Sequence, residues 1–159
     1  MRKFEKISFK EFKEIISDDK EFYDNFKLPE RKTKYSAGYD FSSPIDKKLK
    51  KGECALIPTG VKCKFPGDEV LMIFIRSSLG VKHKIKLSNG TGIIDADYYG
   101  NTDNEGHIFI AIENTGKDDF IINKGDRIAQ GIFIKYYTVT DEEEIIDERK
   151  SGFGSTDGN

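Results

Sequence analysis

Between residues 35 and 137 the chain alternates short apolar runs with turn sequences, and no other feature constrains its fold as strongly. The runs are rich in β-branched and aromatic residues, which favour strands. Segments such as Pro58-Thr59-Gly60 and Pro66-Gly67-Asp68 separate them and are typical of tight turns. We therefore predict an all-β domain with no helix in this region. The expected strands cover residues 35–41, 53–57, 61–65, 69–76, 85–87, 92–94, 107–113, 120–122 and 127–137.

Two of these runs, residues 70–75 and 108–112, are apolar on both strand faces. Successive side chains of a strand point to opposite faces, so such runs need cover on both sides. Two packed sheets would provide that cover, and so would an oligomer that buries the outer face. The predicted architecture is a distorted β-barrel or jelly roll.

The two ends of the chain differ from this central part. Ser8-Phe9-Lys10-Glu11 fits a capping box, in which Glu11 reaches back to Ser8, and apolar residues follow at helical spacing. We expect a short helix there and a second helical turn over residues 21–26. The glycine-rich residues 149–159 have no core-forming pattern, which is typical of a mobile arm. The predicted division is an N-terminal helical extension (1–30), a β-barrel domain (31–140) and a C-terminal arm (141–159).

The composition excludes several classes of protein. The net charge is −2 with 34% charged residues, so no overall basic field favours nucleic acid. The only two cysteines, Cys54 and Cys63, provide neither a disulfide framework nor metal-finger spacing. No apolar run approaches membrane-spanning length, and the charged N-terminus does not resemble a secretory signal. These features predict a soluble, cytoplasmic protein that binds neither nucleic acid nor membrane.

The segment from Gly92 to Gly100 carries the strongest chemical signal. An apolar run is followed by Asp95 and Asp97, which share a face if the segment is extended, and then by Tyr98. A carboxylate placed directly after an apolar strand can be held in position and partly desolvated, as a general base or a metal site requires. Taken alone, the same pattern also fits an Asp-rich turn.

Three further segments place polar groups beside apolar strands. Arg76-Ser77-Ser78 follows a strongly apolar run, which fits either an ion pair within the protein or a cradle for phosphate. Gln130 lies among isoleucines and needs a partner inside the fold, across an interface or on a ligand. Asp40 interrupts a strand-like run, either as a turn residue or as a water-mediated metal ligand.

Together these segments resemble the five ordered motifs of the trimeric dUTP pyrophosphatases (dUTPases). The resemblance covers roughly residues 35 to 156, which is most of the chain outside the N-terminal helix. The matching segments are Ala37–Asp40, Arg76–Gly80, Asn89–Gly100, Gly125–Gln130 and Gly152–Thr156.

The resemblance implies hydrolysis of dUTP to dUMP and pyrophosphate with Mg²⁺. Asp95 would be the general base that activates the attacking water, whereas Asp97 would be structural. Asp40 would touch the Mg²⁺ only indirectly, through water, because a cation carried on the phosphates needs few protein ligands. The residues implied to contact the phosphates are Arg76, Ser77, Ser78, Gln130, Arg149, Gly154, Ser155 and Thr156.

The same resemblance implies a pocket for the base and the sugar. Tyr98 would pack under the deoxyribose and exclude a 2′-hydroxyl, and Phe153 from the arm would stack on the uracil. The arm of one subunit would close a site built by the other two, so a homotrimer with shared sites is implied. The residues implied to surround the base and sugar are Asn89, Gly92, Ile93, Ile94, Tyr98 and Phe153.

Two other functions remain open at this level. A dCTP deaminase resembles this family in fold and in its Arg-Ser motif, but it uses a glutamate where this chain has Asp95. A dUTPase-like regulator that binds a protein partner is the second alternative, and the N-terminal helix or the loop over residues 101–106 would offer the surface. The fifth motif departs from the family pattern, since Glu148 stands where an arginine is usual. Either Arg149 or Lys150 would then make the phosphate contact.

Overall fold

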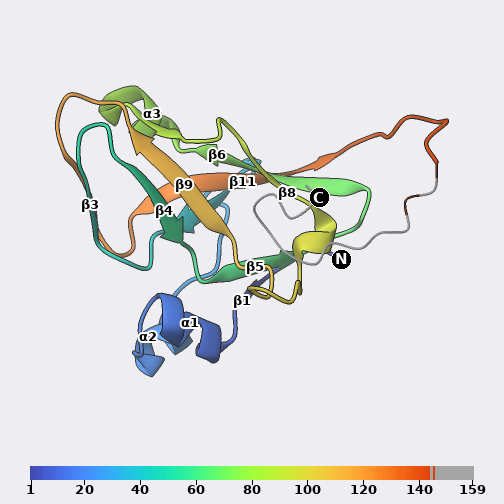
Figure 1. The fold of residues 1–159 in the computed structure, drawn as a ribbon, viewed down its shortest axis with the longest axis horizontal. Helices are drawn as coiled ribbons and strands as arrows, with labels where there is room; N and C mark the ends of the chain where they lie inside the picture. The colour runs from blue at the N-terminus through green and yellow to red at the C-terminus, as the bar shows by residue number, and fades with distance from the viewer. Residues whose placement is uncertain (144, 146–159) are drawn as a thin grey trace, which may run out of the picture.

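The computed structural model describes residues 1–143 and 145 (Figure 1). Within them the chain forms eleven strands, three short α-helices and one 3-10 helix. Every strand pair is antiparallel. The strands belong to four separate sheets, of four, three, two and two strands. The prediction of a mostly β protein is therefore confirmed, whereas the closed barrel or jelly roll stays a prediction.

The four-stranded sheet has the order β2-β11-β6-β8. Its members are β2 (Tyr39–Ser42), β6 (Glu69–Ile75), β8 (Gly92–Ile94) and β11 (Arg127–Lys135). The register of β11 on β2 shifts between Arg127 and Ala129. This irregularity lets Ile128 and Ala129, although adjacent, both enter the core. Gln130 follows directly and lies opposite Asp40 on β2 and Phe74 on β6.

The remaining strands build the other side of the core. Three of them form the order β4-β9-β7, and two pairs, β3–β10 and β1–β5, complete the set. Their bounds are β1 (Lys3–Lys6), β3 (Lys47–Leu49), β4 (Cys54–Pro58), β5 (Val61–Lys64), β7 (Ile85–Leu87), β9 (Phe109–Asn114) and β10 (Phe120–Ile122). All nine expected strands are present, and β1 and β3 are additional.

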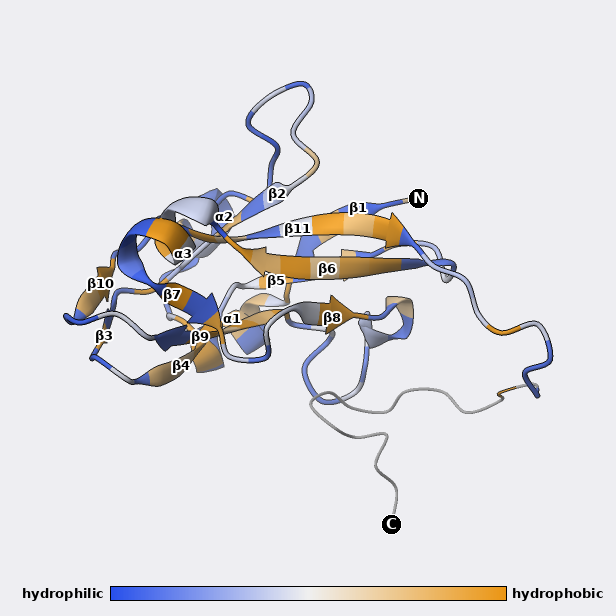
Figure 2. Ribbon diagram, turned by 90° about the horizontal axis from the view of Figure 1, so that it is seen from above, coloured by the Kyte–Doolittle hydropathy of each residue, from blue (hydrophilic) through white to orange (hydrophobic). Residues whose placement is uncertain are grey.

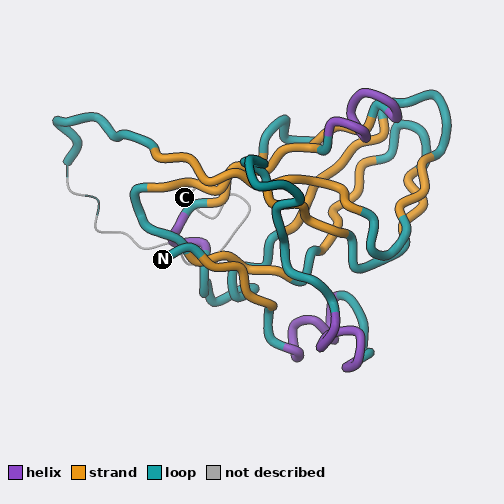
Figure 3. The backbone as a smooth tube through the Cα atoms, turned by 180° about the vertical axis from the view of Figure 1, so that it is seen from behind, coloured by secondary structure: helices purple, strands orange, loops and turns teal. Residues whose placement is uncertain are grey.

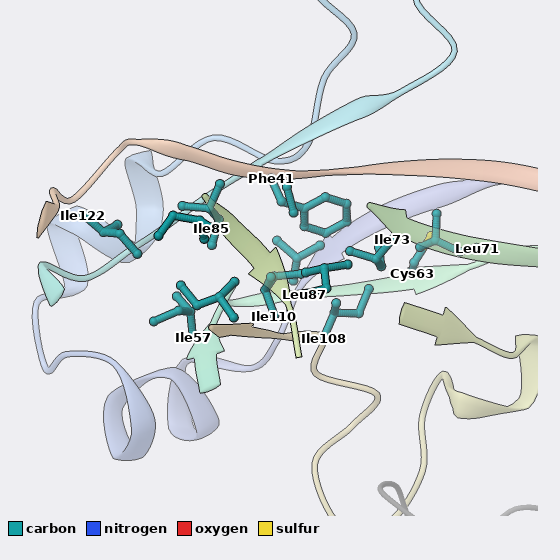
Figure 4. Close-up of a cluster of buried hydrophobic side chains, with 14 of the residues drawn as sticks. Phe41, Ile57, Cys63, Leu71, Ile73, Ile85, Leu87, Ile108, Ile110 and Ile122 are labelled. Atoms are coloured by element: carbon teal, nitrogen blue, oxygen red, sulfur yellow. The ribbon is translucent and has the colours of Figure 1, made fainter. Parts of the chain in front are cut away.

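The core lies where the inward faces of the sheets meet (Figure 4). Leu71 and Ile73 of β6 point into it, and Ile110 of β9 meets them from the three-stranded sheet. The alternate residues of β6, Val70 and Met72, are only half-buried. The single chain therefore covers one face of this strand and leaves the other, equally apolar face partly open.

The N-terminal segment is part strand and part helix. α1 (Phe9–Ile15) and α2 (Lys20–Asn25) confirm both expected helices, which lie together below the sheets in Figure 3. The Ser8 hydroxyl accepts a hydrogen bond from the Glu11 N–H, as the capping box predicts. The reciprocal bond differs from the prediction, because Glu105 rather than Glu11 accepts from the Ser8 N–H.

Two helices contradict the expectation of a helix-free central region. α3 (Ser77–His83) begins directly after β6, and η1 (Ala96–Tyr98) begins directly after Asp95. α3 is short and ends at Lys84, whose φ of 58° is left-handed. Both helices lie between predicted strands, in segments where no regular structure was expected. Helices this short are stabilised mainly by tertiary packing rather than by their own sequence.

Candidate active site

A pocket of about 230 Å³ opens beside β8, and we call it the β8 pocket. Asn89, Gly92, Ile93, Ile94, Asp95 and Tyr98, all expected around the base, sugar or reacting phosphate, line it together. Five apolar residues that the sequence analysis did not assign complete the wall: Ile73, Leu87, Phe109, Ile110 and Ala111. A concave, largely apolar wall with a few polar groups is typical of a small-molecule site.

Glycine makes the position of β8 possible. β8 pairs with β6, with Gly92 opposite Ile73 and Ile94 opposite Leu71. A Cβ at Gly92 would lie 2.9 Å from the Ile73 Cβ, closer than two side chains can approach. The absence of a side chain therefore lets backbone groups of β8 line the pocket. Asn89 lies on an exposed turn just before β8, in which the Gly90 N–H donates to the Leu87 carbonyl at 3.1 Å.

Asp95 lines the β8 pocket and lies at the junction of β8 and η1. Its backbone is extended, with φ −81° and ψ 156°, and its carbonyl accepts from the Tyr98 N–H at 3.1 Å. The side chain is exposed, so the partial desolvation expected for this carboxylate is not provided in the single chain. Any desolvation has to come from a ligand or from further protein groups.

Tyr98 forms a rigid part of the same pocket. Its side chain is buried, and its hydroxyl donates to the His107 carbonyl at 2.9 Å. The same hydroxyl accepts from Asn104 Nδ2 at 2.8 Å. Two hydrogen bonds at opposite sides of one hydroxyl hold the ring in a single orientation.

A second group of charged residues, which we call the arginine cluster, comprises Asp40, Arg76 and Arg127. The Asp40 side chain is only 13% exposed; it accepts a hydrogen bond from Arg127 and forms an ion pair with Arg76. Its Oδ1 lies 3.2 Å from Arg76 Nε, and its Oδ2 lies 2.8 Å from an Arg127 nitrogen. The turn-residue interpretation of Asp40 is thus wrong, and its carboxylate neutralises part of the charge of two cations.

Arg127 was not among the predicted site residues, although it lies within Gly125–Gln130, the segment that contains the predicted Gln130. Gln130 itself is half-buried against the first motif. A Cβ at Gly38 would lie 2.5 Å from Gln130 Oε1, so glycine is needed for this approach. Ser77 and Ser78 are exposed at the start of α3. The first, second and fourth motifs therefore meet at one place.

The β8 pocket and the arginine cluster do not meet within the chain. Ile94 pairs with Leu71, so Asp95 lies alongside Val70 at one end of β6, and Arg76 follows the other end. Six residues of strand separate these positions, or about 20 Å at about 3.3 Å per residue. The lining of the β8 pocket accordingly includes none of the predicted phosphate ligands.

Several predicted site residues lie outside the described part of the chain: Arg149, Phe153, Gly154, Ser155 and Thr156. Within residues 1–143 and 145, no group of three or more His, Cys, Asp or Glu side chains could hold a metal ion. No helix in that same part of the chain has the length and apolar composition needed to cross a membrane.

Comparison with known proteins identifies the family. The dUTPase family model matches residues 24–157. The chain belongs to the dUTPase family. It is 42% identical over 130 residues to the deoxyuridine 5'-triphosphate nucleotidohydrolase of Lactococcus lactis subsp. lactis, covering 81% of this chain and 87% of the relative. This match favours the prediction of a dUTPase over the alternative of a dCTP deaminase.

Solved dUTPase structures share the fold. The crystal structure of dUTPase from Streptococcus mutans superposes with a TM-score of 0.71 at 34% identity, covering 86% of this chain and 97% of that one. A mutant dUTPase from phage phi11 of S. aureus gives a TM-score of 0.68 at 24% identity, covering 95% and 99%. At that identity the phage enzyme supports the fold alone. The N-terminal strand and α1 lie before the residues that the family model matches.

Proposed function

We propose that the β8 pocket and the arginine cluster are two halves of one site that hydrolyses dUTP to dUMP and pyrophosphate. Membership of the dUTPase family assigns this reaction to the chain. The assignment of roles to individual residues is ours. The observation that carries it is the joint lining of a single pocket by Asn89, Gly92, Ile93, Ile94, Asp95 and Tyr98.

The β8 pocket would select the base through its backbone and through Asn89. A wall that hydrogen-bonds the edge of uracil leaves buried groups unpaired when cytosine enters, and such a mismatch can cost about 10⁴–10⁵-fold. Gly92 and Ile94 bring the β8 backbone close to the bound ring. The extra methyl of thymine would overpack this wall, at a cost of about 1–3 kcal/mol.

Tyr98 would form the floor under the deoxyribose. Its ring is buried at the base of the β8 pocket and is held by hydrogen bonds to His107 and Asn104. A floor that cannot retreat leaves no space for a 2′-hydroxyl. UTP would therefore bind with its sugar displaced and its α-phosphate out of line with Asp95.

Asp95 would take a proton from the water that attacks the α-phosphorus. Asp95 lines the pocket and is exposed, so its carboxylate would be accessible to the 5′ side of a bound nucleoside. Proton removal by a positioned base contributes about 10²–10⁴-fold. The remaining acceleration would come from positioning and from neutralising the charge of the phosphates.

The phosphate ligands have to come from another copy of the chain. Asp95 and Arg76 are separated by about 20 Å along β6, and the three phosphates of one nucleotide cannot bridge that distance. If copies assemble, the β8 pocket of one chain can face the arginine cluster and the exposed Ser77 and Ser78 of a neighbour. Gln130 beside Gly38 would join that surface. The half-buried apolar face of β6 supplies area for such an assembly, and a homotrimer with shared sites is our proposal.

Mg²⁺ would arrive on the triphosphate rather than in a protein cage. Asp40 is paired with two arginines, and the described residues contain no cluster of three or more His, Cys, Asp or Glu side chains that could hold a metal ion. This fits a hard cation that keeps its waters and takes phosphate oxygens as ligands. When bound, it would offset phosphate charge, and Asp40 would contact it only through water. The phage phi11 dUTPase coordinates a structural Mg(II) ion.

The C-terminal arm would close the site. Phe153 would stack on uracil, and Arg149, Gly154, Ser155 and Thr156 would cover the phosphates. Closure would also supply the desolvation that Asp95 lacks in the single chain. A chain ending at residue 148 should keep its β-core, measured by circular dichroism, and lose most of its turnover.

Release of pyrophosphate from dUTP, dCTP, dTTP and UTP, with and without Mg²⁺, tests the proposal. We expect dUTP to be strongly preferred and Mg²⁺ to increase the rate. Ammonia released from dCTP would instead indicate a deaminase. Absence of turnover with every nucleotide would contradict the enzymatic role and favour a protein-binding function.

A further inference from the structure

The Tyr98 hydroxyl forms two hydrogen bonds with the segment that follows it. It donates to the His107 carbonyl and accepts from Asn104 Nδ2, at 2.9 and 2.8 Å. A carbonyl only accepts, so the hydroxyl proton points to His107 and the oxygen lone pair faces Asn104. The orientation of the ring therefore depends on where Asn104 sits.

The Asn104 side chain has its own orientation fixed. Its Oδ1 accepts from Asn101 Nδ2 at 2.8 Å and from the Gly106 N–H at 3.0 Å. Asn101 is buried, and its Nδ2 also donates to the Tyr98 carbonyl at 2.9 Å. With Oδ1 committed to two donors, Nδ2 has to face the Tyr98 hydroxyl. The loop thus forms a closed hydrogen-bonded frame around Tyr98.

Glu105 ties this frame to the N-terminal segment. Its backbone is left-handed, with φ 60°, which turns its side chain away from Asn104 toward Ser8. The carboxylate accepts from the Ser8 N–H at 3.0 Å, from the Ser8 hydroxyl and from Lys62 Nζ at 2.8 Å. Burial alone would raise the pKa of Glu105, yet its pKa is lowered because Lys62 and Ser8 stabilise the carboxylate.

A second link runs parallel to the first. The Tyr99 hydroxyl donates to Glu5 of β1, next to the pairing of β1 with β5. The Ile7 N–H donates to the Gly60 carbonyl at 3.1 Å, and the Gly60 N–H donates to His107 Nε2 at 2.9 Å. The N-terminal segment therefore contacts Glu105, which follows Asn104, and Gly60, which donates a hydrogen bond to His107.

We infer that residues 101–107 are a brace that sets sugar selectivity, with Asn104 as a positioning residue and the N-terminal segment as its anchor. The inference rests on the proposed contact between Tyr98 and the deoxyribose. Loosening the brace would let the Tyr98 ring retreat and admit a 2′-hydroxyl. The expected signature is a gain of activity toward UTP rather than a loss toward dUTP.

The test compares kcat/KM for UTP and dUTP in Asn104→Leu, which keeps the side-chain size and removes the hydrogen bonds of this side chain to Tyr98, Asn101 and Gly106. We expect kcat/KM for UTP to rise about three- to tenfold, the factor set by one neutral hydrogen bond. Tyr98→Phe, which removes the bond to Asn104 together with the bond to His107, should raise it similarly. The two effects should not add in the double variant, since both single variants break the Asn104–Tyr98 bond. Asn25→Leu, at an exposed position of α2, is the matched control and should change nothing.

Three outcomes would separate the explanations. Equal losses for both nucleotides in Asn104→Leu would show a merely structural loop and overturn the inference. An unchanged UTP:dUTP ratio in Asn104→Leu would also overturn it, provided that Tyr98→Ala changes the ratio. If Tyr98→Ala leaves the ratio unchanged as well, the proposed sugar contact itself fails.

The anchor is tested by Ser8→Ala and Glu105→Gln, with Ser36→Ala in the loop before β2 as control. Both variants weaken the link between the N-terminal segment and the brace while leaving the Asn104–Tyr98 bond in place. We expect a smaller rise, about twofold, in kcat/KM for UTP. If the UTP:dUTP ratio stays unchanged in both variants while Asn104→Leu alters it, the proposed role of the N-terminal segment as the anchor is wrong.

Discussion

The β8 pocket and the arginine cluster differ in how much of a binding site each provides within one chain. The pocket has a floor, walls and an internally fixed Tyr98, and its shape depends on contacts inside the same chain. The arginine cluster provides charged side chains rather than a shaped pocket. It gathers Arg76 and Arg127 around Asp40 at the far end of β6 and leaves Ser77 and Ser78 exposed.

This difference indicates how each half would recognise its part of the nucleotide. A flat, uncharged base is distinguished by close packing and unpaired hydrogen bonds, which require a wall built in advance. Phosphates are recognised mainly by charge, and charged side chains can be supplied by a neighbouring surface. The exposed loop before β2 projects from the sheets in Figure 2 and returns to them at Gly38, beside Gln130.

The largest expected effect is that of Asp95→Asn. The amide keeps the shape of the side chain but cannot take a proton, so turnover of dUTP should fall about 10²–10⁴-fold. Affinity for a non-hydrolysable dUTP analogue should change little. Steady-state kinetics and calorimetry measure the two effects, and a variant with near-normal turnover would remove Asp95 from the catalytic role.

Mixing two inactive variants tests the separation of the halves. Asp95→Asn and Arg76→Ala, unfolded and refolded together in equal amounts, should regain activity if each site takes one residue from each of two copies. Random assembly leaves about a quarter of the sites with both residues native. The unmixed variants, treated in the same way, are the controls. A mixture as inactive as its components would place both residues in one chain's site.

His107 should make the pocket side of the molecule sensitive to acid. Burial lowers the pKa of His107 from 6.5 to about 4, although Glu105 acts in the opposite direction. Its Nε2 accepts from the Thr59 and Gly60 N–H groups, so the folded state needs the neutral ring. As the pH falls, His107 is protonated in the unfolded chain at a higher pH than in the folded chain. Folding stability is therefore lost as the pH falls below 6.5 toward 4.

Between pH 7 and 5 this loss should reach about 2 kcal/mol in the free energy of unfolding. Urea titrations at the two pH values measure it, and His107→Gln should be less stable at pH 7 but nearly independent of pH in this range. Wild-type stability that is flat between pH 7 and 5 would contradict the buried, neutral His107.

The smallest effect is expected from Asp40→Asn in the arginine cluster. The amide retains hydrogen bonding but removes the charge that two arginines share, and the side chain is only 13% exposed. We expect a loss of about 1–2 kcal/mol in the free energy of unfolding. Asp24→Asn breaks the exposed Lys20–Asp24 pair and should cost no more than a few tenths of a kcal/mol. Equal losses would mean that Asp40 is an ordinary surface carboxylate.

Much of the fold follows from local sequence. Each apolar run from β4 to β11 became a strand because strand periodicity and the glycine and proline turns are local signals. The Ser8 cap likewise marked the start of α1 correctly. The order of motifs also identified the residues of the β8 pocket, since they lie in one short segment that folds back on β6.

Tertiary structure decided what local signals could not. β1 and β3 are rich in lysine and have no apolar run, so they become strands only because β5 and β10 offer them pairing partners. The pairing of Asp40 with Arg76 and Arg127 joins residues from three strand ends, and no sequence spacing encodes it. The brace from Ser8 through Glu105 to Tyr98 likewise joins groups about ninety positions apart.

The sequence by itself determined the nine strands that follow apolar runs, the family and the residue types that line the β8 pocket, because these depend on residue type and local order. Only the tertiary structure decided that Asp95 and Arg76 stand at opposite ends of β6 and that Tyr98 is held by the loop that follows it. Both depend on strand register and on hydrogen bonds between distant segments. Such contacts form only when the sheets pack, so a linear pattern does not contain them.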